Sequence, residues 1–192
     1  MIYPHEILNH NRTNAELQEL LIFCICAAGK RSGQQAVKVE IFLTPDRSKR
    51  LNCLPFTFIK GCTDRQLLFW MKYAGLGQYT KLMKAFRQVV ELDVRTCTLD
   101  QLEGVHGIGP KTARFFLMMS RPNQRHAILD THILKWLNSE HGIDVPKSSP
   151  SSHKVYHKLE GIFLNICDRL KVNPAEFDLQ IWSRASILRG NL

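Results

Sequence analysis

The sequence predicts an all-α protein of about ten helices. Along nearly the whole chain of 192 residues, apolar residues recur at helical spacing and do not alternate as they would on a strand. Hydrophobic residues make up 44% of the chain and charged residues 22%, which is enough apolar material for a core and too much for a disordered chain.

The expected helices are separated by glycines, prolines and polar connections. The first helix becomes almost wholly apolar, so we expect it to be central and buried. Residues 29–33 interrupt it, residues 45–55 form a polar and basic connection, and residues 142–152 form a linker rich in Pro and Ser. The ranges expected to be helical are 14–28, 34–42, 64–73, 79–92, 99–104, 110–120, 131–139, 152–170 and 174–188.

Capping residues mark several of these helix ends. Thr63 or Asp64 can begin the helix that Gly75 and Gly77 end, and Asn173 can begin the last one.

The chain is strongly basic, with 26 Lys and Arg against 17 Asp and Glu and a net charge of +9. This excess favours a polyanionic partner, of which nucleic acid is the commonest, although many basic proteins bind none. Lys81, Lys84 and Arg87 recur every three residues and therefore group on one side of a helix. They form either a solvated face or a set of phosphate contacts.

The sequence predicts neither a membrane span nor a metal site. No stretch approaches the roughly 18 apolar residues that a span needs, and the longest apolar run, Leu20–Ala28, follows an acidic segment, unlike a signal peptide. The six cysteines contain no C-x-x-C pair and no zinc or cluster spacing. We therefore expect an intracellular protein with reduced cysteines, no membrane partner and no metal bound by side chains.

The most informative stretch is residues 102–137. A capping box at Thr98 opens a short helix, and Pro110 begins the next helix at its first position. Between the two helices, Gly107 and Gly109 lack a Cβ, so that a phosphate can approach their N–H groups beside the positive end of a helix dipole. A plain helix–helix corner with a glycine turn is the alternative interpretation.

Two residues of this stretch can carry chemistry. Lys111 lies in the first turn of the helix after the glycines, where the dipole and partial burial disfavour its charged form, and only a neutral amine attacks carbon. Nineteen residues later, Asp130 stands at the next helix N-cap, where backbone amides hold a carboxylate and keep it ionised. Taken singly, a surface lysine and an ordinary capping aspartate are the alternatives.

Taken together, Gly-Ile-Gly-Pro-Lys-Thr-Ala (107–113) and Ile-Leu-Asp-Thr-His-Ile (128–133) resemble a known family. They are similar to the helix-hairpin-helix glycosylases with a Gly/Pro-rich loop and a catalytic aspartate, the endonuclease III and 8-oxoguanine glycosylase superfamily. The resemblance is close over residues 105–137. Looser similarity covers residues 19–22, 73–79 and 177–182.

The resemblance implies a reaction for the two residues. Lys111 would attack C1′ of a flipped nucleotide, expel the base, form a Schiff base and nick the strand by β-elimination. Asp130 would help to generate the neutral amine and stabilise positive charge on the sugar. Family members that only hydrolyse lack this lysine, so the resemblance implies a bifunctional DNA glycosylase and AP lyase of base excision repair. The implied partner is double-stranded DNA with a damaged base, bound by a monomer.

The resemblance also implies an architecture, with one glycosylase domain over residues 1–192 and two helical lobes flanking a DNA-binding cleft. Residues 30–140 would form a central lobe that contains the hairpin, 98–120. Residues 1–29 and 141–192 would form the second lobe.

DNA contacts are expected from the hairpin and from the segment after the first helix, where the family places residues that enter the duplex. Gln34 or Gln35 would bond the orphaned base, and exposed loop residues are the alternative reading of this segment. The expected DNA-contacting residues are Val105, His106, Gly107, Ile108, Gly109, Thr112, Arg114, Lys30, Arg31, Gln34 and Gln35. Stacking faces for the flipped base are sought among aromatic residues, most of which are expected to prove core: Phe115, Trp70, Phe177 and Trp182.

The resemblance has departures that affect cofactor and substrate. Nothing after Cys167 could supply the four C-terminal cysteines of many endonuclease III relatives, so no iron–sulfur cluster is expected. The family's hairpin holds a monovalent cation, Na⁺ or K⁺, through main-chain carbonyls, here including that of Val105. The chain has no room for the N-terminal sheet domain of eukaryotic-type oxoguanine enzymes, so the compact archaeal kind is the closest class.

The substrate and the function class keep alternatives at this point. Phe115 is bulky and no base-reading residue finds a match, so 8-oxoguanine is preferred while an oxidised pyrimidine or another modified base stays open. A non-catalytic DNA-binding hairpin module is the alternative from another class.

Overall fold

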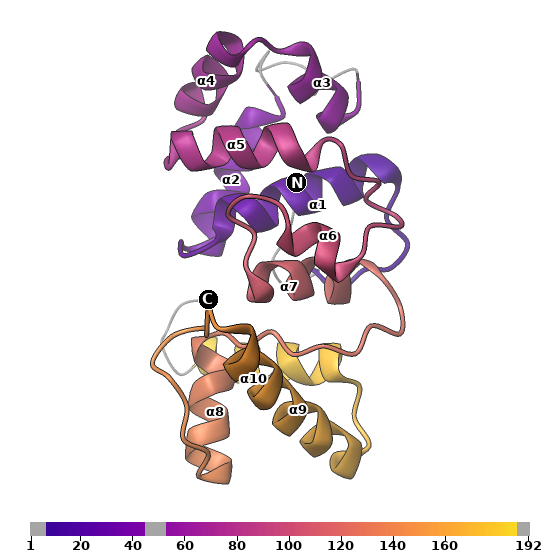
Figure 1. The fold of residues 1–192 in the computed structure, drawn as a ribbon, viewed down its shortest axis with the longest axis vertical. Coiled ribbons are helices and arrows are strands. Elements are labelled where there is room, and N and C mark those ends of the chain that lie inside the picture. Colours follow the sequence, from indigo (N-terminus) through magenta and orange to yellow (C-terminus); the bar gives the residue numbers. More distant parts are fainter. Residues whose placement is uncertain (1–6, 45–52, 188–192) are drawn as a thin grey trace. The chain divides into compact units, whose positions relative to one another are not determined.

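The structure is a computed structural model that describes residues 7–44 and 53–187. These residues form ten α-helices and no strand, which confirms the predicted all-α class (Figure 1). No helix in this part of the chain is long and apolar enough to cross a membrane. The helices are α1 (Asn14–Ala27), α2 (Ser32–Phe42), α3 (Pro55–Gly61), α4 (Asp64–Tyr73), α5 (Tyr79–Val89), α6 (Leu99–Glu103), α7 (Pro110–Ser120), α8 (Thr131–His141), α9 (His153–Leu170) and α10 (Pro174–Ile187).

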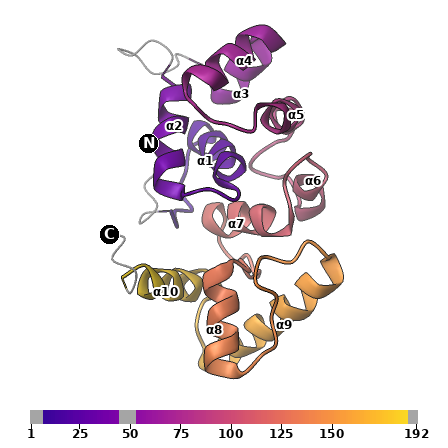
Figure 2. The same ribbon diagram turned by 90° about the vertical axis from the view of Figure 1, so that its left-hand side faces the viewer.

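The chain divides into two compact units, residues 1–108 and 109–192. This division differs from the expected grouping of residues 1–29 with 141–192. The physical reason is the packing of α1, which lies against α2, α3 and α5 and so belongs with the helices that follow it (Figure 2).

The first unit is built around α1. Every residue from Leu17 to Cys26 is buried, and a helix that is apolar nearly all round needs neighbours on all sides. Its start is fixed by a capping box, in which Thr13 accepts the Glu16 N–H at 3.3 Å and Glu16 accepts the Thr13 N–H at 2.7 Å. The expected central, buried first helix is therefore confirmed.

Helix α3 was not predicted. It is only seven residues long, begins with Pro55 at its first turn, and buries Phe56 and Ile59. The buried Gln18 of α1 accepts the Phe56 N–H at 2.9 Å, so a long-range contact anchors this short helix. The expected connection over residues 45–55 lies mostly outside the described residues.

The other helix ends follow local chemistry. The expected helix over 79–92 ends at Val89, because i→i−3 bonds from Glu91 to Gln88 (3.2 Å) and from Leu92 to Val89 (3.0 Å) tighten its last turn. Helix α8 runs two residues beyond its expected end, to the point where Gly142 adopts φ +63° and closes it.

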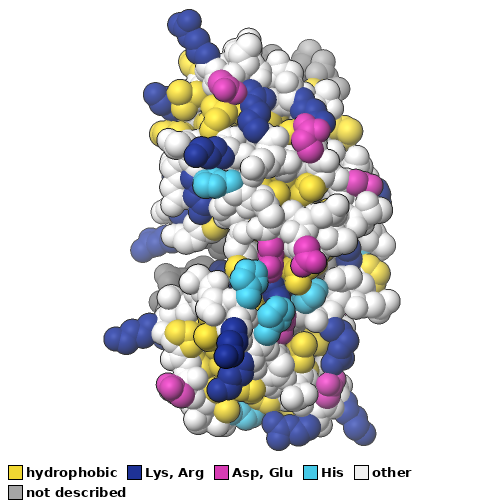
Figure 3. All heavy atoms as spheres, in the orientation of Figure 1, with side chains coloured by type: hydrophobic (Ala, Val, Ile, Leu, Met, Phe, Trp, Pro, Cys, Tyr) yellow, Lys and Arg dark blue, Asp and Glu magenta, His cyan; other side chains and the backbone are white. Residues whose placement is uncertain are grey.

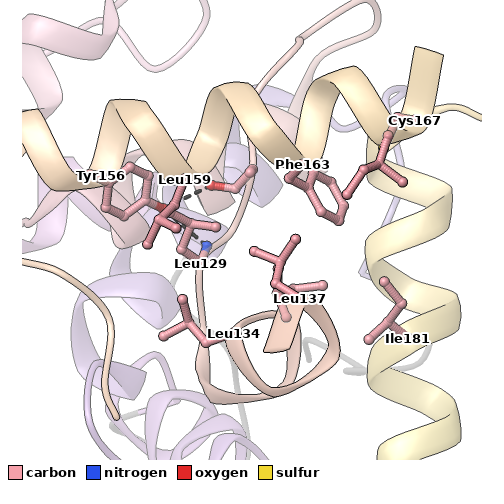
Figure 4. Packing of buried hydrophobic residues seen from close by; sticks show 11 residues of the cluster. Leu129, Leu134, Leu137, Tyr156, Leu159, Phe163, Cys167 and Ile181 are labelled. Carbon is pink, nitrogen blue, oxygen red and sulfur yellow. Dashed lines mark hydrogen bonds between the residues drawn. The ribbon is translucent and has the colours of Figure 1, made fainter. Parts of the chain in front are cut away.

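The second unit has a core between α8, α9 and α10 (Figure 4). Leu137 of α8 lies toward Phe163 of α9 and Ile181 of α10, Leu134 of α8 lies toward Leu129 and Leu159, and all of these residues are buried. Phe177 packs on this core, with its ring 5.2 Å from that of Trp136 and 6.0 Å from that of Phe163. Burial of this apolar surface holds the three helices together.

A buried ion pair ties α7 to α9. Arg114 is 1% exposed and donates two hydrogen bonds to Glu160, from Nε at 2.7 Å and from Nη2 at 3.1 Å. Its guanidinium also lies over the ring of Tyr156, 4.5 Å from the ring centre. Burial alone would raise the pKa of Glu160, but hydrogen bonds from His126, Arg114 and the Ala127 N–H lower it to about 2.

We expect Glu160→Gln to lower the free energy of unfolding by about 3–5 kcal/mol, because it leaves the charge of Arg114 buried without its counter-ion. The matched control is Asp168→Asn, which breaks an ion pair with Arg125 whose two side chains are both 56% exposed. That change is expected to cost less than ~1 kcal/mol. Urea unfolding of both variants at neutral pH checks the difference, and equal losses would contradict the structural role of Glu160.

The same carboxylate gives the prediction a pH dependence. The pKa of Glu160 lies below its ordinary 4.5, so its stabilising effect is present above that value and is lost as the pH falls toward about 2. The wild-type protein should therefore lose more stability than Glu160→Gln over this range.

Candidate functional site

The predicted hairpin turn is held from within the first unit. After α6, the Ile108 N–H bonds to the Val105 carbonyl at 3.0 Å, and both side chains are buried. Gln88 of α5 accepts the N–H of His106 at 2.6 Å, while the imidazole of His106 is exposed. Gly107 adopts φ +82°, which favours glycine.

The predicted basic group on α5 does not act as one set. The side chain of Lys81 lies so close to Gly107 that a Cβ there would collide with it. Arg87 instead ties helices together, donating to the Ile59 carbonyl at 2.7 Å, to the Cys62 carbonyl at 2.6 Å and to Asp64 at 3.0 Å. Lys84 is exposed.

Lys111 lies where the sequence predicts it, in the first turn of α7. Gly109 is the N-cap with extended backbone, and Pro110 occupies the first turn. The side chain of Lys111 is half-buried. It belongs to the second unit, together with Asp130.

Asp130 caps α8 as predicted. One carboxylate oxygen accepts the N–H of His132 at 2.8 Å and that of Ile133 at 2.9 Å. These bonds aim the carboxylate along the start of the helix, where the dipole favours a negative charge. The residue is half-buried.

The segment before Asp130 is clamped by side chains of α9. Glu160 accepts the Ala127 N–H at 3.0 Å, and the Tyr156 hydroxyl donates to the Ala127 carbonyl at 2.8 Å. The same hydroxyl accepts the Leu129 N–H at 3.1 Å (Figure 4). The backbone that delivers Asp130 is thus fixed by groups that are themselves buried.

Asp178 of α10 is a further buried carboxyl that acts on Lys111 and Asp130 electrostatically, and it was not predicted from the sequence. It is 6% exposed, and it interacts electrostatically with both Asp130 and Lys111. Burial raises its pKa first, the charge of Asp130 raises it further, and Lys111 and a hydrogen bond from the Ile128 N–H lower it; the net pKa lies well above the ordinary value. A signal was present, since Ala175, Asp178 and Ile181 share the buried face of α10 at a spacing of three.

The structure corrects one predicted site residue. Arg114 was expected to contact DNA, but its guanidinium is buried and bound to Glu160 and to the Pro110 carbonyl at 3.2 Å. The expectation for Arg114 is therefore wrong. Phe177, which was sought as a stacking face, is half-buried and packs against Phe163, and its stacking role stays a prediction.

The remaining aromatic candidates are partly exposed. Phe115 and Trp182 are half-buried in the second unit, and Trp70 is half-buried in the first. Trp70 packs edge-on against Phe69 and Tyr73, with ring centres 5.0 and 5.9 Å away. They stay candidates for stacking.

The segment proposed to enter DNA is divided by the structure. Lys30 donates to the Leu76 carbonyl at 2.6 Å, and Gln35 is buried in α2 at 3% exposure. Arg31 and Gln34 are exposed, so of the two glutamines Gln34 is the accessible one. Thr112, on α7, is half-buried.

Histidines gather on one face of the protein (Figure 3). Two of them approach Glu160, with Nδ1 of His126 at 3.6 Å and Nδ1 of His157 at 3.4 Å from its oxygens. Within the described ranges, no three His, Cys, Asp or Glu residues are grouped as metal ligands. The Val105 carbonyl uses one lone pair for Ile108 and keeps a second, which fits its expected role toward a monovalent cation.

Solved structures share this fold. The 8-oxoguanine glycosylase/lyase of Methanocaldococcus jannaschii, in complex with DNA containing 8-oxoguanine, aligns over 90% of this chain and 81% of its own, with a TM-score of 0.66 and 22% identity. The 8-oxoguanine DNA glycosylase of Thermotoga maritima aligns over 93% and 83%, with a TM-score of 0.65 and 21% identity. At these identities the likeness concerns the fold.

Sequence comparison gives the family. The 8-oxoguanine DNA glycosylase family model matches residues 2–172, and the chain belongs to that family. A relative from Thermoplasma acidophilum, named 8-oxoguanine DNA glycosylase/AP lyase, is 38% identical over 81 residues. That match covers 42% of this chain and 37% of the relative's length.

We expect Gly107→Ala to destabilise the protein by about 1–3 kcal/mol, because alanine is strained at positive φ and its Cβ would displace the Lys81 side chain. The matched control is Gly33→Ala in α2, where an added Cβ meets no described atom within 4 Å. There alanine should stabilise by up to about 1 kcal/mol, because it favours the helix. Thermal unfolding measures both, and changes of the same sign would contradict the assignment.

Proposed function

We propose that this protein is a DNA glycosylase with AP lyase activity that removes 8-oxoguanine from double-stranded DNA. The observation that carries the proposal is that Lys111 and Asp130 both interact with one buried carboxyl, Asp178. This supports a common site for the amine and the carboxylate that the sequence selects, both of which belong to one compact unit. Family membership supports 8-oxoguanine over an oxidised pyrimidine.

In the proposed reaction, Lys111 loses a proton and its neutral Nζ attacks C1′ of the flipped nucleotide. The C1′–N bond to the base breaks as the C1′–Nζ bond forms, and the electron pair of the broken bond leaves with the base. Opening of the sugar gives a Schiff base, and loss of a C2′ proton then expels the 3′ phosphate by β-elimination. Lysine catalysis of this kind both removes the base and nicks the strand.

Asp130 supplies a fixed negative charge in this reaction. Two backbone N–H groups hold its carboxylate, so it needs no rearrangement as positive charge develops on the sugar. Its carboxylate is also the base that we expect to receive the proton of Lys111. Both residues are half-buried, so part of the solvent is excluded around them. This strengthens the electrostatic attraction between the carboxylate and the positive charge on the sugar.

We expect the hairpin itself to bind DNA. The turn at Gly107 and the start of α7 at Gly109 offer backbone N–H groups to phosphate, a contact that positions the duplex without reading its sequence. A monovalent cation held by the Val105 carbonyl would add positive charge beside the phosphate. A DNA-binding module without catalysis would need neither Lys111 nor Asp130, so their shared site favours the enzyme.

Borohydride trapping tests the nucleophile. A duplex containing 8-oxoguanine should yield a covalent adduct with the wild-type protein, more than undamaged DNA or a thymine glycol duplex does. Lys111→Gln should abolish the adduct, because an amide cannot form a Schiff base. Lys135→Gln, which changes an exposed lysine of α8, is the matched control and should trap normally. An adduct that survives in Lys111→Gln would remove Lys111 from the mechanism.

Asp130→Asn tests the carboxylate. Asparagine caps a helix about as well as aspartate, so the fold should persist while the charge is lost. We expect excision under single-turnover conditions to slow at least ~100-fold, with DNA affinity retained. The exposed Asp168→Asn serves as the comparison. Near-normal excision by Asp130→Asn would reduce Asp130 to a helix cap.

A further inference from the structure

Asp178 is a buried carboxyl with an incomplete set of partners. One of its oxygens accepts the Ile128 N–H, while Oδ2 is buried and has no hydrogen-bond partner among the described residues. An ionised carboxylate in that position would lack most of the donors that replace water. Asp178 is therefore costly to the fold in its charged form, and a costly buried acid beside a nucleophile points to function.

The groups that face Asp178 come from three other helices. Lys111 of α7 and Asp130 at the start of α8 carry opposite charges, so Asp130 raises the pKa of Asp178 and Lys111 lowers it. From α9, Tyr156 and Cys167 interact electrostatically with it. Burial raises the pKa of both, that of Cys167 to about 11, so they are uncharged near neutral pH. Burial, the largest influence on the pKa of Asp178, then decides whether this carboxyl is ionised, and it favours the neutral acid.

We propose that Asp178 is a positioning residue for Lys111 and Asp130, held in the site as an uncharged acid so that the nucleophile faces one negative charge and not two. This inference rests on the proposed function of the same site. Two carboxylates beside Lys111 would hold its proton in place, and the ammonium cannot attack C1′. One carboxylate stabilises the sugar cation and still lets the lysine lose its proton.

The proposal predicts an alkaline limit on catalysis. When the pH rises above the ordinary carboxyl range and Asp178 ionises, its new charge favours the ammonium form of Lys111. Wild-type excision should therefore level off or fall on the alkaline side. In Asp178→Asn this alkaline decline in the excision rate should disappear, because the amide cannot ionise and Lys111 keeps losing its proton as the pH rises.

The same residue has a stability signature with a fixed sign. Its pKa is raised in the folded protein, so above the ordinary value of 3.8 the unfolded chain has released a proton that the folded protein still holds. Stability contributed by Asp178 therefore declines as the pH rises through this interval. Asp178→Asn should be more stable than wild type at neutral pH, and its advantage should shrink toward pH 4.

The experiment compares Asp178→Asn with Asp130→Asn in single-turnover excision of 8-oxoguanine from pH 5 to pH 10. We expect Asp178→Asn to slow excision by no more than about tenfold at neutral pH, the size of altering one neutral hydrogen bond. Asp130→Asn should slow it at least ~100-fold. Equal, large losses in the two variants, or identical pH profiles for Asp178→Asn and wild type, would overturn the proposal.

Two readouts do not need activity. Infrared spectra of the free protein should show a protonated carboxyl band at neutral pH that is absent in Asp178→Asn, and thermal unfolding should show the stability advantage of the variant. Absence of that band from the wild-type protein would refute the neutral acid even if the variant fails to fold. If wild type excises no lesion while the band is present, the proposed function fails and the buried neutral acid stands.

Discussion

The buried ion pair between Arg114 and Glu160 is the interaction on which the candidate site depends. Arg114 lies one turn after Lys111 on α7, and Glu160 on α9 also holds the Ala127 N–H, three residues before Asp130. One carboxylate thus fixes both the helix of Lys111 and the segment that leads to Asp130. Because a buried pair is strongly oriented but adds little net stability, its value here is geometric.

Two buried carboxyls of the second unit, Glu160 and Asp178, differ in protonation state because different numbers of hydrogen-bond donors reach them. Glu160 accepts bonds from Arg114, His126 and the Ala127 N–H, which outweigh its burial and keep it ionised. Asp178 accepts a bond from Ile128 and leaves Oδ2 without a partner in the described part of the chain, so burial prevails. The first carboxyl orders the fold, whereas the second is buried at a cost in stability, a feature that is common at functional sites.

Much of the fold was predictable because its signals are local. The proline at the start of α7 and the capping aspartate of α8 lie in the sequence directly at the helices that they begin. The burial of Arg114 was not predictable, since its partner lies 46 residues away and a basic residue on a helix usually faces solvent. Asp178 was missed for the same reason: its role depends on α7 and α8, and its own helix shows only an acid on an apolar face. Likewise, nothing in the sequence around Phe177 indicated that its ring would pack against residues of α8 and α9.

The glycine turn and the two candidate catalytic residues take their places from different units. The turn at Gly107 takes its shape from α5, through Gln88 and Lys81, and so depends on the packing of the first unit. Lys111 and Asp130 take their places from α9 and α10 in the second unit. Under the proposed function, damage to the turn should change how DNA is held, whereas damage around Lys111 and Asp130 should change how fast the bond to the base breaks. A glycosylase needs both, since a flipped nucleotide must be held by its backbone while a fixed amine and carboxylate act on its sugar.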